Sequence, residues 1–94
     1  MAGMLEHNIT LITGGSTGIG RATALILARE GATVVIADLQ DEEGANTVSQ
    51  IAAAGGKAEY HHVDVANHEA VSGLMQHIER THGALDGAFN NAGI

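Results

Sequence analysis

Three glycines near the N-terminus, Gly14, Gly18 and Gly20, have the spacing of a turn that brings the backbone against a ligand. They lie between a β-branched run and a stretch of helical period, where the chain must change direction sharply. Glycine suits such a turn because a Cβ would block a positive φ or a close backbone approach. A helix that begins there presents free N–H groups and a partial positive charge, which favour a phosphate group. Ser16 and Thr17 would add hydroxyl donors, and no lysine follows Gly20, so the Walker phosphate-binding pattern is absent.

An acidic residue, Asp38, follows the second apolar run, eighteen positions after Gly20. An acid at about this distance accepts hydrogen bonds from ribose hydroxyls in dinucleotide-binding sheets. The same carboxylate would repel a 2′-phosphate, and neither Thr17 nor Leu39 supplies a cation to offset it. The sequence therefore predicts a dinucleotide site that prefers NAD(H) to NADP(H). The alternatives are that the glycines form a plain loop and that Asp38 caps a turn before Asp41.

Six histidines raise the question of a metal site, but their spacing gives it little support. His61 and His62 are neighbours in a predicted strand, so their side chains would face opposite sides. His77 and His82 are five positions apart, whereas a helical zinc pair is four apart. With no cysteine and no third convergent ligand in the pattern, we expect no metal.

The scaffold for these residues follows from short β-branched runs that alternate with longer helical stretches, the pattern of a parallel α/β sheet. The expected strands span 8–13, 33–37, 57–63 and about 85–90, and the first expected helix spans 19–30. Right-handed crossovers give the strand order 3-2-1-4 with three helices, a Rossmann-type doubly wound parallel sheet. The glycine turn and the segment 90–93 then meet at the switch point between strands one and four, where such sheets bind ligands.

The ends of the helices are marked by residues that cap or stop them. Gly31 is expected just after the first helix, Asp41 as the N-cap of the second, and Asn67 as the N-cap of the third. Gly55-Gly56 and Gly83 would end the second and third helices. The expected buried stripes are Ala45, Val48, Ile51 and Ala52 in the second helix, and Val71, Leu74, Met75 and Ile78 in the third. The alternative for the last stripe is a surface for a partner protein.

The composition limits the classes of protein that the chain can belong to. Its 94 residues allow one domain, 1–94, and its 45% hydrophobic content is that of a globular protein. The net charge of −7 opposes binding to nucleic acid or to an anionic membrane. The absence of cysteine fits a reducing compartment, and the N-terminus resembles no signal peptide. We therefore expect a soluble, cytoplasmic protein.

Four motifs in order resemble the short-chain dehydrogenases/reductases over nearly the whole chain. They are Thr-Gly-x-x-x-Gly-x-Gly at 13–20, Asp38, Asp64-Val65 and Asn90-Asn91-Ala92-Gly93, with the spacing of the ordinary branch of the family. The resemblance implies that Asp64 bonds the adenine amino group, that the Val65 backbone contacts the ring, and that Asn90 ties the central strands together. It also implies that the last three residues of the Asn-Asn-Ala-Gly motif line the floor of the site. The cofactor-binding set is then Gly14, Ser16, Thr17, Gly18, Ile19, Gly20, Asp38, Leu39, Asp64, Val65, Asn91, Ala92 and Gly93.

The family comparison also places the reacting residues outside the chain. Family members run to more than twice this length, and their catalytic Ser and Tyr-x-x-x-Lys follow the Asn-Asn-Ala-Gly motif. Tyr60 has no lysine four positions on, so we expect it to be structural and expect no catalytic residue in the chain. The chain is then the inactive N-terminal part of an enzyme that moves a hydride between NAD and a secondary alcohol or ketone. The alternatives are a non-catalytic dinucleotide-binding module and a methyltransferase-like adenosine site.

A last expectation concerns the fourth strand, which carries Ala88 and Phe89. If the chain ends at Ile94, this strand is an uncovered sheet edge, and such edges favour pairing with another chain. We therefore expect marginal stability or self-association through that edge.

Overall fold

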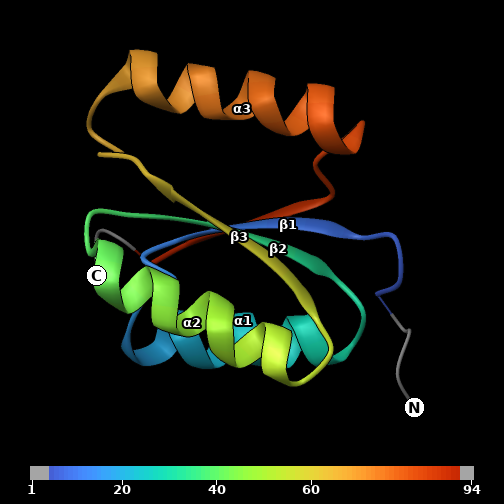
Figure 1. The fold of residues 1–94 in the computed structure, drawn as a ribbon. Helices are drawn as coiled ribbons and strands as arrows, with labels where there is room; N and C mark the ends of the chain where they lie inside the picture. The colour runs from blue at the N-terminus through green and yellow to red at the C-terminus, as the bar shows by residue number, and fades with distance from the viewer. Residues whose placement is uncertain (1–4, 92–94) are drawn as a thin grey trace.

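The computed structural model describes residues 5–91, whose helices and strands alternate as the sequence predicts (Figure 1). The elements are β1 (Ile9–Thr13), α1 (Gly18–Arg29), β2 (Thr33–Asp38), α2 (Asp41–Ala53), β3 (Lys57–His62), α3 (His68–His82) and β4 (Gly87–Asn90). The strands form one parallel sheet in the order β3-β2-β1-β4. The predicted Rossmann-type α/β fold is therefore confirmed, with its switch point between β1 and β4.

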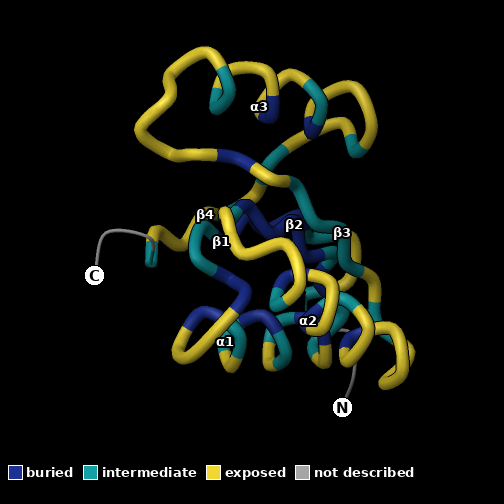
Figure 2. Tube along the Cα trace, turned by 60° about the vertical axis from the view of Figure 1, so that its left-hand side comes forward, coloured by how far each residue is buried: buried dark blue, intermediate teal, exposed yellow. Residues whose placement is uncertain are grey.

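The sheet lies between two helical layers, with α1 and α2 on one face and α3 on the other (Figure 1). Side chains alternate along a strand, so β2 contributes Val34 and Ile36 to the core under α1 and α2, and Val35 and Ala37 to the core under α3. Each of the valine and isoleucine side chains stabilises the fold by about 1.5–3 kcal/mol when fully buried. Figure 2 shows the burial by residue: β1 and β2 are mostly buried, β3 is mostly half-buried, and β4 and most of α3 are exposed.

Several predicted helix ends are confirmed. Gly31 follows α1 with a φ of 102°, and its N–H donates to the carbonyl of Ala28 at 3.0 Å. Asn67 caps α3, because its Oδ1 accepts the N–H of Ala70 at 3.1 Å. Gly83 ends that helix with a φ of 90°. A positive φ at these two glycines lets the chain leave each helix abruptly.

The predicted N-cap of α2 is wrong. Gln40 takes the cap position, and Asp41 is the first residue of the helix. The Asp41 carboxylate is instead held by residues of β3: its Oδ1 lies 2.6 Å from the Tyr60 hydroxyl and 2.7 Å from Nδ1 of His62. These two hydrogen bonds, with that from Tyr60 the stronger influence, lower the pKa of Asp41. A tertiary contact has therefore replaced the local cap.

The predicted buried stripe of α2 is wrong at two of its four positions, since Ala45 and Ala52 are exposed. The helix buries Gly44, Thr47 and Ile51. The Tyr60 ring explains the orientation, because a Cβ on Gly44 would lie 2.2 Å from two of its carbons. The helix thus approaches β3 through its glycine, and its alanines face solvent.

The stripe of α3 is confirmed except for one residue. Leu74 and Ile78 are buried and Val71 is half-buried against the same core, but Met75 is exposed. Along residues 5–91, no helix has the length and apolar character needed to cross a membrane.

β4 starts at Gly87, two residues later than predicted, and within the described chain it pairs only with β1. Its side chains are largely uncovered, and Phe89 is 48% exposed.

Candidate functional site

A cavity of about 420 Å³ opens at the carboxyl ends of the strands, around the start of α1. Its size is within the range of small-molecule and cofactor sites. Eight of the predicted site residues line it: Gly14, Thr17, Ile19, Gly20, Asp38, Leu39, Val65 and Asn91. The predicted convergence of the glycine turn and the end of β4 at the switch point is therefore present in the fold.

The glycine turn has the geometry that its residue types predict. Gly14 and Gly18 have φ values of 71° and 57°, which residues with a side chain rarely adopt. Gly20 packs against the turn so closely that a Cβ would lie 1.9 Å from the carbonyl oxygen of Gly14. The Gly14 N–H donates to the carbonyl of Ala37 at 2.9 Å and so fixes the turn to the end of β2.

The start of α1 faces the cavity with its backbone donors available. Thr17 occupies the cap position and is exposed, and its side chain makes no capping hydrogen bond within the described chain. The first N–H groups of a helix have no intrahelical acceptor, and the helix dipole adds a partial positive charge at this end. The arrangement suits a phosphate or another anion at the mouth of the turn.

Asp38 bridges the end of β2 and the glycine turn. Its Oδ2 accepts the N–H of Ser16 at 3.3 Å, and its Oδ1 accepts the N–H of Leu39 at 2.7 Å. An ionised carboxylate has about four acceptor positions, so two donors leave capacity for a ligand in the cavity. The turn-capping alternative is thus present as the bond to Leu39, but Asp38 also lines the cavity and contacts the glycine turn.

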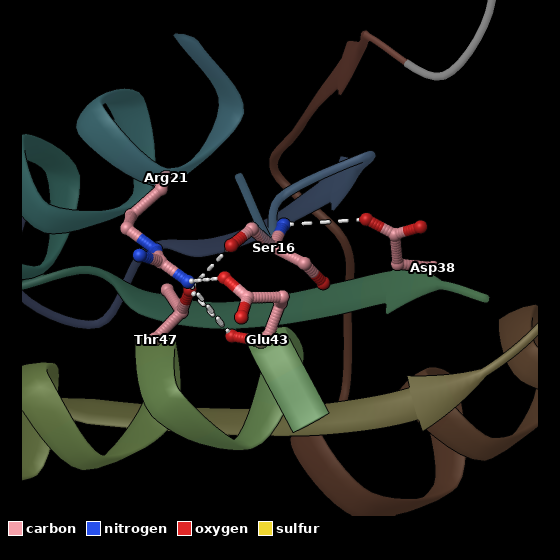
Figure 3. Close-up of polar contacts among 5 residues, drawn as sticks. All are labelled: Ser16, Arg21, Asp38, Glu43 and Thr47. Carbon is pink, nitrogen blue, oxygen red and sulfur yellow. Dashed lines mark hydrogen bonds and ion pairs between the residues drawn. The ribbon is translucent and has the colours of Figure 1, made fainter. Parts of the chain in front are cut away.

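A polar network behind the turn was missed by sequence reasoning (Figure 3). Nε of Arg21 donates to Thr47 Oγ1 at 2.9 Å, and its Nη2 lies 2.9 Å from Glu43 Oε2 and 3.1 Å from the Glu43 carbonyl. The Thr47 hydroxyl lies 3.1 Å from the carbonyl of Ser16 and so connects the network to the turn. The only sequence signal is a cation directly after Gly20. Because its guanidinium is engaged by α2, Arg21 is a support of the turn and not a free cation.

The other predicted site residues lie off the cavity or outside the described residues. Ser16 is fully buried beneath the turn, Gly18 forms the turn without lining the cavity, and the exposed Asp64 accepts the N–H of Ala66 at 2.9 Å. Ala92 and Gly93 lie outside residues 5–91. Sequence reasoning missed Ala37, Gln40 and Val63, which line the cavity between the predicted positions.

Asn90 and Asn91 take different roles at the end of β4. The Thr13 hydroxyl donates to Asn90 Oδ1 at 2.9 Å, which joins the two central strands as the family resemblance implies. Asn91 lines the cavity, and no acceptor among residues 5–91 bonds its buried Nδ2. A buried donor without a partner costs about 1–3 kcal/mol. An acceptor on a bound ligand would remove that cost.

The residues around the cavity fit a dinucleotide. A Cβ at Gly20 would disrupt the turn, the helix start provides donors for a pyrophosphate, and Asn91 has a donor that no residue within 5–91 accepts. None of the described lining residues is Lys or Arg, so the phosphates would be held by backbone groups.

Neither Tyr60 nor any histidine within residues 5–91 lines this cavity. The Tyr60 hydroxyl lies 2.9 Å from the Asp38 carbonyl as well as close to Asp41, and burial followed by the Asp41 carboxylate raises its pKa. His61 and His62 face opposite sides of β3, as predicted. The expectation that no third ligand converges on the histidines is wrong, because Glu59, His61 and His77 come together between β3 and α3.

Comparison with known proteins agrees with this geometry. The family model described as short chain dehydrogenase matches residues 8–94. The 3beta-hydroxysteroid dehydrogenase of Mediterraneibacter gnavus is 47% identical over 92 residues, which are 98% of this chain and 33% of the relative.

Two solved structures superpose with the chain and differ in their cofactor. An NAD+-bound xylitol dehydrogenase has a TM-score of 0.86 at 30% identity, over 90% of this chain and 33% of that protein. A metagenomic short-chain oxidoreductase in complex with NADP has a TM-score of 0.87 at 33% identity, over 89% of this chain and 38% of that protein. The chain thus spans about a third of the length of the proteins it matches.

Proposed function

Because this chain belongs to the short-chain dehydrogenase family, whose members bind a nicotinamide dinucleotide, we propose that its cavity is the NAD(H) site of an oxidoreductase. The observation that carries the proposal is the position of Asp38. Its carboxylate lies on the cavity and bonds the Ser16 N–H of the glycine turn. An acid in that place accepts the hydroxyls of the adenosine ribose while the turn receives the pyrophosphate.

The preference for NAD(H) over NADP(H) follows from the charges at this end of the sheet. A 2′-phosphate would stand next to the Asp38 carboxylate, and none of the described residues that line the cavity is a cation. Arg21 directly follows the lining residue Gly20, but Glu43 and Thr47 already engage its guanidinium. Loss of the ribose hydroxyl contacts and like-charge repulsion would both weaken NADP(H) binding.

Different residues would contact different parts of the cofactor. Asp64 and Val65 would contact the adenine, and the chain from Asn91 onward, with Ala92 and Gly93, would pass beneath the ribose and nicotinamide. In the whole protein the bound nicotinamide would exchange a hydride with a secondary alcohol or ketone. The role of residues 1–94 would be to bind the cofactor and to orient it.

Binding measured by NADH fluorescence tests the proposal. Asp38→Ala should weaken NADH binding at least tenfold, because charge-assisted hydrogen bonds contribute about 1.5–3 kcal/mol. The matched control is Glu42→Ala, which removes the same charge from an exposed position on α2 and should leave NADH affinity unchanged. Equal affinities for the two variants would refute the role of Asp38, and no NADH binding to the unmodified protein would refute the site.

A further inference from the structure

A second group of polar side chains lies on the opposite face of the sheet, between β3 and α3. Glu59 and His61 are two positions apart on β3, so they point to the same face. In the sheet they are paired with Val35 and Ala37, whose side chains belong to the core under α3. None of the residues of this group lines the dinucleotide cavity.

Three imidazoles surround the Glu59 carboxylate. Its Oε2 lies 2.5 Å from Nε2 of His61 and 3.0 Å from Nε2 of His77, and its Oε1 lies 2.7 Å from Nε2 of His82. The His61 and His77 rings are 4.8 Å apart between their centroids. One ligand atom each from Glu59, His61 and His77 can be chosen so that all lie within 4.8 Å of one another.

These donors are of the kind and spacing that a transition metal requires. Two ligands that each lie ~2.1 Å from a tetrahedral zinc ion are about 3.4 Å apart, so small side-chain rotations that move Glu59 Oε2 away from the His61 and His77 nitrogens would admit an ion in place of the two hydrogen bonds. Two histidines and one glutamate are a known zinc ligand set that leaves a fourth position for water. Side-chain exposures of 28% for Glu59 and 38% for His77 give an ion access from solvent.

The charge of the Glu59 carboxylate also suits a cation. Partial burial raises the pKa of Glu59, but the hydrogen bonds from His61, His82 and His77 outweigh it and bring that pKa to about 2. The carboxylate is therefore ionised at neutral pH. A neutral histidine binds a metal through a ring nitrogen.

We propose that Glu59, His61 and His77 form a binding site for a divalent first-row transition cation such as Zn²⁺. His82 holds the second carboxylate oxygen and orients Glu59, as hydrogen-bonded partners of metal ligands do. A bound ion would cross-link β3 to α3 and so stabilise the layer that covers this face.

The test is a calorimetric titration of the natural protein that carries residues 1–94, without a histidine tag, with ZnCl₂. Glu59→Gln, His61→Gln and His77→Gln should each weaken Zn²⁺ binding by more than tenfold, since even the loss of an outer partner costs about 10–100-fold. The control is His62→Gln, which alters the neighbouring residue on the other face of β3 and should leave Zn²⁺ affinity unchanged. Circular dichroism and NADH binding report whether each variant is folded.

A second readout uses Co²⁺, whose visible absorption reports its ligands. The unmodified protein should give a tetrahedral or five-coordinate spectrum that Zn²⁺ displaces, and His77→Gln should lose it. Absence of Zn²⁺ binding to the unmodified protein would overturn the proposal. An equal loss of Zn²⁺ affinity in His62→Gln would also overturn it, and so would an unchanged Zn²⁺ affinity in His77→Gln. Because His77 is partly exposed on α3, its substitution keeps the test available if Glu59→Gln does not fold.

Discussion

The close approach of α1 to the glycine turn gives a prediction whose size follows from one contact. In Gly20→Ala the added Cβ would lie 1.9 Å from the carbonyl oxygen of Gly14 and 2.8 Å from its carbonyl carbon. Both are backbone atoms, which cannot rotate away as a side chain would. The substitution therefore requires α1 or the turn to move.

The free energies can be compared with those of a second helical glycine. Gly73 in α3 is exposed, and a Cβ there meets nothing within 4 Å, so Gly73→Ala should stabilise the protein by the ordinary helix-propensity gain of about 1 kcal/mol. Gly20→Ala has the same gain, but overpacking costs about 1–3 kcal/mol and a backbone clash belongs at the upper end. We expect a net destabilisation of about 2 kcal/mol, and a difference of about 3 kcal/mol between the two variants.

Urea unfolding of the two variants and the unmodified protein measures this difference directly. Gly20→Ala should also lose NADH affinity, because the displaced helix end no longer meets the turn, whereas Gly73→Ala should keep it. If Gly20→Ala were as stable as Gly73→Ala and bound NADH normally, the close packing of α1 on the turn would be refuted.

Three further predictions concern the supports of the fold. Arg21→Lys should destabilise the protein by about 1 kcal/mol and weaken NADH binding, because lysine cannot reproduce the guanidinium contacts to Thr47 and Glu43. Unchanged urea unfolding and NADH titration would refute the role of Arg21 in supporting the glycine turn. Glu59 has a pKa lowered from 4.5 to about 2, so its contribution to stability is complete above pH 4.5 and is lost as the pH falls towards 2. Acid titration monitored by circular dichroism should therefore show a steeper loss of stability in the unmodified protein than in Glu59→Gln, and parallel curves would contradict this. If residues 1–94 alone associate by strand pairing along β4, Phe89→Lys should reduce that association in sedimentation velocity, because charges oppose strand pairing; an unchanged sedimentation coefficient would count against pairing through this edge.

The parts of the fold that the sequence predicts are those that local patterns control. The alternation of β-branched runs and helical stretches, with handed crossovers, is sufficient for the strand order. Gly31 and Asn67 are predictable because a helix end is decided by a few neighbouring residues. The convergence of Gly20, Asp38 and Asn91 also follows, because the carboxyl ends of parallel strands meet at one edge.

The errors occur where a distant residue decides the outcome. Asp41 is a good local N-cap, but Tyr60 and His62 of β3 bind its carboxylate, and the same tyrosine ring turns Gly44 towards the sheet. The histidine group depends on how α3 lies over β3, which no spacing within one element reveals. In hindsight, the alternation of Glu59 and His61 on one face of a strand was the available signal.

The most direct test of the central claim is the ratio of the dissociation constants of NADPH and NADH for the unmodified protein, measured by fluorescence at constant salt. The Asp38 carboxylate lines the cavity, and none of the described lining residues is a cation. We therefore expect NADH to bind at least tenfold more tightly than NADPH, which is the effect of one charge-assisted contact of about 1.5 kcal/mol. Equal or tighter binding of NADPH would contradict the role of Asp38. Failure of both cofactors to bind would contradict the dinucleotide site itself.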